Sequence, residues 1–360
     1  MVRSRTARTR AGLGLAAMVV AATLAILAPA RPVEAQTNGC PTVGTNFGGT
    51  GPFAVTVQAE SVTTYYSPTN LGSNGCTRHP VILWGNGTFT TPTVYDGLLR
   101  HLASHGFVVA AANTSNAGTG TEMLQGLTQL TQWNGQAGNR FYQRVDVERV
   151  GTTGHSQGGS GAMRAAQDPR VDTAFPVEGG FFNSTGLSVT VPTLFLAGET
   201  DTLTPGIRSA YQAAAATIPA AYAELAGASH LVPLGDGGGF RPAITAWARW
   251  RLMGDATAGA QFLGASCGLC TSSAWSDYQA NARLQQLGGG DPGPGPGPGP
   301  GPGACVQAVN SAQVQAGRAT SLLVFAFAVG SNDYLGATWA TTSLRQTATS
   351  PPTWSLTTAC

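Results

Sequence analysis

The sequence predicts an α/β fold whose core is a doubly wound, mostly parallel sheet. Short apolar runs of the kind found in buried strands alternate with segments of helical periodicity through the larger part of the chain. At one transition from strand to helix, "VGTTGHSQGGSGAM" at residues 150–163, the chain contains the pattern Gly-x-Ser-x-Gly. Alternation of this kind is typical of doubly wound sheets, in which functional groups gather at the carboxyl ends of the strands.

The expected elements follow one another in a regular order. The β-rich segments "FAVTVQAE" (53–60) and "VTTYY" (62–66) favour an opening antiparallel pair. Four runs that are apolar almost throughout are expected to form buried parallel strands: "PVILWG" (80–85), "FVVAAAN" (107–113), "RVGTTG" (149–154) and "PTLFLAG" (192–198). Three intervening segments are expected to be helices: "VYDGLLRHLASHG" (94–106), "GTEMLQGLTQLTQW" (120–133) and "GGSGAMRAAQDP" (158–169).

The composition divides the chain into four parts. Residues 1–35 combine arginines, an apolar run and small residues ahead of Gln36, which is the layout of a secretory signal peptide, with an uncleaved membrane anchor as the alternative. Residues 288–303, "GGGDPGPGPGPGPGPG", have no apolar side chain to bury and are expected to be a semi-flexible linker. We therefore expect a large domain over residues 36–287 and a small one over residues 304–360.

Charge and composition exclude several function classes. The formal net charge is +2, and removal of residues 1–35 would take away five arginines and one glutamate and leave −2. A near-neutral protein offers no electrostatic reason to bind nucleic acid or an anionic membrane. The sequence contains no lysine, which excludes Schiff-base chemistry and a P-loop. Neither a metal nor another cofactor is expected.

Six cysteines remain after residue 35. An even number in an exported protein indicates disulfides, and we expect the sequential pairing: Cys40–Cys76, Cys267–Cys270 and Cys305–Cys360. The C-x-x-C spacing of Cys267 and Cys270 also suits a redox pair or half of a zinc site, but no second C-x-x-C or nearby histidine pair completes one. A bond between the ends of residues 304–360 would help a domain too small for a large core.

The Gly-x-Ser-x-Gly pattern occurs twice, around Ser156 and around Ser266. Glycine makes up 49 of 360 residues, so the pattern alone decides little. Ser156 follows the strand-like "ERVGTTG" and precedes a helical segment, which is the strand–turn–helix order of a nucleophile elbow. Ser266 lies beside two cysteines and has neither element around it. Ser156 is therefore the candidate nucleophile.

A serine hydroxyl needs a base, and the base needs an acid that orients it. In folds with this elbow the chain order is Ser, acid, His, and His230 is the only histidine after Ser156. The acid is expected just beyond the strand "PTLFLAG", where both Glu199 and Asp201 occur. Asp201 is preferred because it lies further into the loop, shortly before the helix start "TPGIRSAYQ". Ser156, Asp201 and His230 are the candidate catalytic residues, with Glu199 as the alternative acid.

The anionic intermediate of acyl transfer needs hydrogen-bond donors that are placed in advance. The backbone N–H of Gln157, directly after the nucleophile, is expected to be one. The loop "GNGTF" after the first parallel strand is expected to supply the other. Thr88 is the preferred residue there, with Asn86 and Gly87 as alternatives.

Other residues have competing interpretations. Phe89, in the same loop, and His155, before the nucleophile, are candidate substrate-binding residues, with structural packing as the alternative for both. His101 and His105 share a helix face at a spacing that could bind a metal, but no third ligand lies beside them, so a solvated face is expected. Glu178 is expected to be a structural or loop acid.

The chain resembles the bacterial polyesterase–lipase–cutinase group of α/β-hydrolases over about residues 53–277. Four segments carry the resemblance: "RHLASHGFVVAAANTSN" (100–116), "GHSQGG" (154–159), "SVTVPTLFLAGETD" (188–201) and "ELAGASH" (224–230). The resemblance implies an α/β-hydrolase fold and a cofactor-free serine esterase for polyesters such as cutin or poly(ethylene terephthalate). The signal-peptide layout of residues 1–35 predicts that the protein is secreted and extracellular. A polyhydroxyalkanoate depolymerase or short-chain lipase is the alternative with the same chemistry, and an inactive hydrolase-fold binding protein is the alternative without it.

The resemblance also bears on single residues. It supports both proposed partners of Ser156. It places Thr88 where the family has an aromatic oxyanion residue, and Gln157 where members often have methionine. The family's tryptophan beyond the strand after the elbow is absent, and Phe181 and Phe182 are candidate substrate-binding residues in its place.

Residues 304–360 resemble short modules appended to secreted bacterial depolymerases. They are expected either to contact a polymer surface, which raises the local concentration of substrate, or to be a passive stability or secretion module. The expected partner is an ester or polyester. Nucleic acid is not expected as a partner, nor is a membrane once residues 1–35 are removed. The protein is expected to be a monomer.

Overall fold

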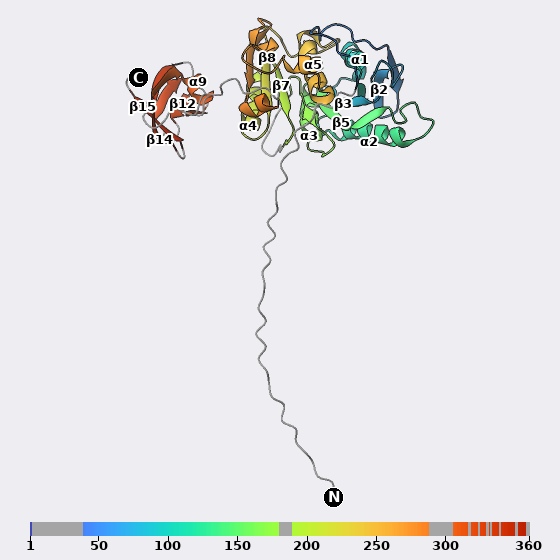
Figure 1. The fold of residues 1–360 in the computed structure, drawn as a ribbon, viewed down its shortest axis with the longest axis horizontal. Helices are drawn as coiled ribbons and strands as arrows, with labels where there is room; N and C mark the ends of the chain where they lie inside the picture. Colours follow the sequence, from blue (N-terminus) through green and yellow to red (C-terminus); the bar gives the residue numbers. More distant parts are fainter. Residues whose placement is uncertain are drawn as a thin grey trace. The chain divides into compact units, whose positions relative to one another are not determined.

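The computed structural model describes residues 39–179 and 189–287 continuously and residues 305–357 in several short pieces (Figure 1). Some expectations lie outside the described residues, namely those for the signal peptide 1–35, the linker 288–303, Phe181, Phe182 and the Cys305–Cys360 bond. Within the described part, no helix is both long enough and apolar enough to cross a membrane.

One nine-stranded sheet organises the described residues between 39 and 287, in the order β1-β2-β4-β3-β5-β6-β7-β8-β9. Its strands are β1 Val55–Ala59, β2 Thr63–Pro68, β3 His79–Gly85, β4 Val108–Ala112, β5 Val145–Gly154, β6 Thr173–Ala174, β7 Thr193–Gly198, β8 Ala220–Leu225 and β9 Trp275–Ala280. Six strands that lie side by side in this order, β4, β3, β5, β6, β7 and β8, run parallel to one another. Strands β1, β2 and β9 pair antiparallel with their neighbours. The expected doubly wound sheet and its opening antiparallel pair are confirmed.

Helices cover both faces of this sheet. Successive side chains of a strand point to opposite faces, so a strand that is apolar throughout has apolar side chains to bury on both. On β3, Ile82 and Trp84 join one buried cluster, and Val81 and Leu83 join the other. The first cluster includes α1 and α5, and the second includes α2, α3 and α4 (Figure 1). These helices are α1 Asp96–Ser104, α2 Thr121–Gly135, α3 Gln157–Ala165, α4 Thr204–Ala215 and α5 Arg241–Met253. The shorter ones are η1 Pro92–Tyr95, η2 Gly238–Phe240, α6 Ala256–Gly259, α7 Gly268–Thr271 and α8 Ala282–Gln286.

The expectation that His101 and His105 lie on a solvated face is wrong. The two residues are 9% and 1% exposed. His101 Nε2 lies 3.0 Å from both the carbonyl oxygen of Phe47 and Thr245 Oγ1, and His105 Nε2 lies 2.9 Å from the carbonyl oxygen of Gly49. Burial lowers the pKa of both imidazoles to about 4, so they are neutral at physiological pH. They therefore attach the segment around residues 47–49 to α1.

Two of the three expected disulfides, Cys40–Cys76 and Cys267–Cys270, are present. The first joins the start of the described chain to the loop before β3. The second closes the short turn at α7, so these two cysteines hold no metal. Bonds of this kind stabilise a fold mainly by restricting the unfolded chain.

The described pieces of residues 305–357 form two three-stranded antiparallel sheets, β10-β14-β15 and β11-β12-β13. Their elements are β10 Cys305–Val309, α9 Asn310–Gln315, β11 Ala319–Leu322, β12 Phe325–Ala328, β13 Tyr334–Ala337, β14 Thr341–Thr349 and β15 Pro352–Thr357. They share a small buried cluster made of Ala319, Ala328, Leu335, Leu344 and Trp354.

Candidate active site

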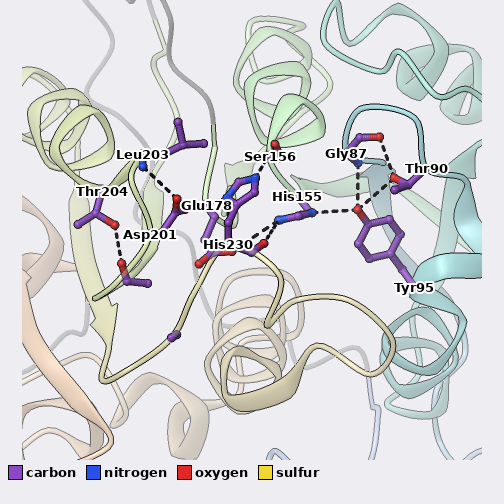
Figure 2. A network of polar contacts seen from close by, with 12 residues as sticks. Gly87, Thr90, Tyr95, His155, Ser156, Glu178, Asp201, Leu203, Thr204 and His230 are labelled. Atoms are coloured by element: carbon purple, nitrogen blue, oxygen red, sulfur yellow. Dashed lines mark hydrogen bonds and ion pairs between the residues drawn. The ribbon is translucent and has the colours of Figure 1, made fainter.

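Ser156 occupies the turn between the end of β5 and the start of α3 (Figure 2). Its backbone angles, φ 56° and ψ −119°, lie in a region that residues other than glycine rarely adopt. The backbones cross closely beside this turn, so a Cβ atom at Gly154 or Gly158 would overlap the carbonyl oxygen of Gly85. This geometry is that of a nucleophile elbow, which presents the hydroxyl at the carboxyl end of the sheet.

Ser156, His230 and Asp201 form a continuous chain of hydrogen bonds (Figure 2). Ser156 Oγ lies 2.9 Å from His230 Nε2, and His230 Nδ1 lies 2.8 Å from Asp201 Oδ2. Asp201 is 5% exposed, and its Oδ1 accepts the N–H of Leu203 at 2.9 Å. Because a carboxylate only accepts, Nδ1–H donates to Asp201, which leaves Nε2 free to accept the serine proton. The structure thus brings together the three residues that the sequence singles out.

The alternative acid, Glu199, lies in the same loop but points elsewhere. Its Oε2 accepts the N–H of Gly227 at 2.7 Å. The N–H of Asp201 donates to the carbonyl of Gly198 at 3.0 Å, and this tight turn after β7 brings Asp201 to His230. The second Gly-x-Ser-x-Gly serine, Ser266, lies in an irregular turn before α7 with no strand directly ahead of it.

Two backbone N–H groups are available for the oxyanion. Among the described residues, those of Thr88 and Gln157 have no hydrogen-bond acceptor, whereas Gly87 N–H donates to Tyr95 Oη at 3.1 Å. The loop that carries Thr88 lies next to the nucleophile, because a Cβ atom at Gly87 would be 3.6 Å from Ser156 Cβ. Thr88 and Gln157 therefore remain the candidate donors, and Gly87 is occupied.

His155 connects the loop that carries Gly87 and Thr88 to the loop of His230 (Figure 2). Its Nε2 lies 2.9 Å from the carbonyl oxygen of His230, and its Nδ1 lies 2.9 Å from Tyr95 Oη, which in turn accepts the N–H of Gly87. Because a carbonyl only accepts, Nε2 carries the proton and Nδ1 accepts from the tyrosine hydroxyl. Burial lowers the pKa of His155 to about 4, which keeps this ring neutral. At 3% exposure and with both nitrogens bonded, His155 holds the loops together and offers no free polar atom to a substrate.

Two large apolar side chains next to site residues are exposed. Phe89, which follows Thr88, is 92% exposed, and Leu231, which follows His230, is 66% exposed. Phe89 also has a φ of 62°, an uncommon conformation for a bulky residue. Backbone strain of this kind gathers at ligand-binding sites. Phe89 is therefore in a position to contact a substrate. Leu231 is a second candidate substrate-binding residue, which the sequence did not indicate.

Glu178 is a fourth ionisable residue of the site that sequence reasoning missed. Its side chain is 0% exposed, and its Oε2 lies 3.5 Å from His155 Nε2 and 3.9 Å from His230 Nδ1 (Figure 2). Burial, and secondarily the charge of Asp201, raises the pKa of this carboxyl to about 9, so it is protonated at neutral pH. The available signal was an acid placed directly after the apolar run "AFPV".

His155, Glu178 and His230 are the one group of described residues that offers three possible metal-ligand atoms within 4.8 Å of one another. All four ring nitrogens of the two histidines already have hydrogen-bond partners within the protein. A metal ion would have to displace one of these bonds. The arrangement therefore suits proton transfer better than metal binding.

Comparisons with known proteins find relatives over much of the chain. Residues 30–282 match the family model "PETase: PET hydrolase-like". Cutinase 1 of Thermobifida cellulosilytica is 34% identical over 142 residues, which cover 37% of this chain and 53% of that protein. The cutinase of Thermobifida fusca (strain YX) is 34% identical over 142 residues, 37% of this chain and 46% of that protein. Bis(hydroxyethyl) terephthalate hydrolase of Streptomyces coelicolor is 30% identical over 200 residues, 51% of this chain and 62% of that protein. The chain spans about half the length of the curated relatives it matches.

Proposed function

Because the chain belongs to the PET hydrolase-like family, we propose that it is a secreted serine hydrolase of carboxylic esters. The observation that carries the proposal is the pair of hydrogen bonds, 2.9 Å and 2.8 Å long, that joins Ser156 through His230 to the buried Asp201. The elbow that holds Ser156 and the two unpaired N–H groups beside it supply the other parts that acyl transfer requires.

In the first half-reaction, Ser156 Oγ attacks the carbonyl carbon of the ester while His230 Nε2 takes the hydroxyl proton. Asp201 stabilises the resulting imidazolium through Nδ1–H. The carbonyl oxygen becomes an oxyanion, which accepts hydrogen bonds from the backbone N–H groups of Gln157 and Thr88. His230 then returns the proton to the leaving alkoxide, and an acyl-enzyme on Ser156 and a free alcohol are formed.

In the second half-reaction, water takes the place of the alcohol. His230 Nε2 removes a proton from the water as its oxygen attacks the acyl carbon, and the same two N–H groups stabilise the second oxyanion. The tetrahedral intermediate collapses when His230 protonates Ser156 Oγ. The carboxylic acid leaves, and the serine is restored without any cofactor.

The proposed substrate is a polyester. The exposed Phe89 and Leu231 beside the triad favour an apolar chain that stays partly in solvent. Of the three relatives described above, two are named as cutinases and one as a bis(hydroxyethyl) terephthalate hydrolase. A polyhydroxyalkanoate depolymerase or a short-chain esterase would use the same catalytic residues, and a substrate panel distinguishes these activities.

A substrate panel tests this proposal. The full chain and a chain that ends at Leu287 are compared on p-nitrophenyl butyrate and on films of poly(ethylene terephthalate) and polyhydroxybutyrate. If residues 304–360 bind a polymer surface, their removal is expected to reduce product release from film several-fold, because they no longer raise local concentration, and to leave the soluble ester unaffected. Equal losses on both substrates, or on neither, would contradict a surface-binding role. Failure to hydrolyse any ester would contradict the proposed function.

A further inference from the structure

Glu178 stands between the two strands that carry the nucleophile and the acid. Val177 forms parallel bridges to His155 on one side and to Leu196 on the other. The N–H of Ser156 donates to the carbonyl of Val177 at 3.0 Å, and the N–H of Glu178 donates to the carbonyl of Leu196 at 2.8 Å. Glu178 is therefore fixed by backbone hydrogen bonds at the same sheet edge as Ser156 and Asp201.

The Glu178 side chain is held in a costly state. It is fully buried, its φ of 46° is uncommon for this residue type, and neither carboxyl oxygen has a hydrogen-bond partner among the described residues. Burial of an unpartnered polar group destabilises the folded state, because the group loses its hydrogen bonds to water and gains none in the protein. A side chain at Gly198 would overlap Glu178 Oε1, so the neighbouring strand leaves room for it. Packing alone does not explain such an arrangement, because an apolar residue would avoid these costs.

We propose that Glu178 is a positioning residue that acts as a second acid of the catalytic centre, able to orient His230 through Nδ1 when Asp201 cannot. Its Oε2 lies 3.9 Å from His230 Nδ1, the same nitrogen that Asp201 Oδ2 contacts at 2.8 Å. A shift of about 1 Å would bring the two atoms within hydrogen-bond distance. This role rests on the proposed function, since it concerns the base that activates Ser156.

The charges around Glu178 explain why Asp201 takes this role first. Among the described residues, the ionisable groups that face its carboxyl are His155, His230 and Asp201. His155 is neutral, and the negative charge of Asp201 opposes a second negative charge nearby. Glu178 therefore keeps its proton while Asp201 is ionised. Removal of the Asp201 charge lowers the pKa of Glu178, and the ionised carboxylate can then accept the N–H of His230.

A pair of variants tests the exchange of acids. Asp201→Ala is compared with the double variant Asp201→Ala/Glu178→Gln, with kcat for p-nitrophenyl butyrate measured from pH 6 to 9. The double variant is expected to lose about 10⁴-fold relative to the unmodified chain, as when a catalytic acid is removed elsewhere. The single variant is expected to retain at least about tenfold more activity than the double, with kcat rising with pH as Glu178 ionises. Asp201→Ala/Glu199→Gln is the matched control and should behave as the single variant, because Glu199 contacts Gly227 and not His230.

A second measurement is independent of activity. A carboxyl whose pKa rises from 4.5 to about 9 on folding binds more protons in the folded chain than in the unfolded one, so stability falls as pH rises across that interval. Glu178→Gln is expected to flatten this decline in the thermal midpoint between pH 5 and 9 and to keep its fold, because glutamine has the shape of the neutral acid.

The outcomes separate the two proposals. Equal kcat values and pH profiles for Asp201→Ala and the double variant, in an active parent, would overturn the role of Glu178 and leave the proposed function standing. So would a thermal midpoint whose pH dependence is unchanged by Glu178→Gln. Absence of esterase activity in the unmodified chain would overturn both.

Discussion

Replacement of Ser156 by alanine is expected to lower kcat for p-nitrophenyl butyrate by about a millionfold, as loss of a catalytic serine does in a comparable triad. The variant retains the N–H groups proposed for the oxyanion, but it has no oxygen that can form the acyl-enzyme. The fold is expected to be kept, because the only hydrogen bond described for Ser156 Oγ is the one to His230. The measurement is the initial rate of nitrophenolate release, with circular dichroism to verify the fold.

Ser266→Ala provides the matched control, since Ser266 lies in the second Gly-x-Ser-x-Gly pattern of the same chain. Its activity should equal that of the unmodified protein, because no strand or helix forms an elbow around it. Turnover above background in Ser156→Ala, or a comparable loss in Ser266→Ala, would show that the nucleophile is misassigned.

His230→Ala is expected to have an effect of similar size, about a millionfold in kcat. Among the described residues, His230 is hydrogen-bonded to both Ser156 and Asp201, so its removal leaves the serine without a base and Asp201 Oδ2 without this partner. The side chain is 32% exposed, so the space it leaves is open to solvent. Added imidazole should therefore restore part of the activity, which a merely unfolded variant would not show. Activity within about a hundredfold of the parent and no response to imidazole would point to another base.

The sequence predicted the fold well where strands are long and rich in Val, Leu and Ile. It did not predict β6, β8 or β9. Only two residues, Thr173 and Ala174, form β6, and β8 is the alanine-rich "AAYAEL", which has no β-branched residue. β9, "WSDYQA", is a partly buried strand at the edge of the sheet and has no apolar run. Such strands exist because the neighbouring strands supply hydrogen-bond partners, and this information is not local.

The catalytic candidates could be predicted because few alternatives existed. His230 is the only histidine after Ser156, and an acid was required in one loop. The choice between Asp201 and Glu199 depends on a turn that the sequence does not display, in which the N–H of Asp201 donates to Gly198. The place of Glu178 in the site could not be predicted for a similar reason, because its burial comes from the packing of two neighbouring strand ends.

The burial of His101 also could not be predicted from the local sequence. Two histidines four residues apart on a helix give no local sign of which face is covered. The segment around Phe47 covers this face through a contact between residues 54 positions apart in sequence. Long-range contacts of this type decide burial, and the periodicity of the sequence does not indicate them.

The most direct test of the central claim, that Ser156 is a nucleophile activated by His230, is labelling with a fluorophosphonate followed by peptide mass spectrometry. The unmodified chain is expected to acquire one adduct, on Ser156, and to lose its esterase activity in proportion. The His230→Ala variant is expected to remain unlabelled over the same time. An unlabelled parent, or an adduct on a different serine such as Ser266, would contradict the assignment of the site.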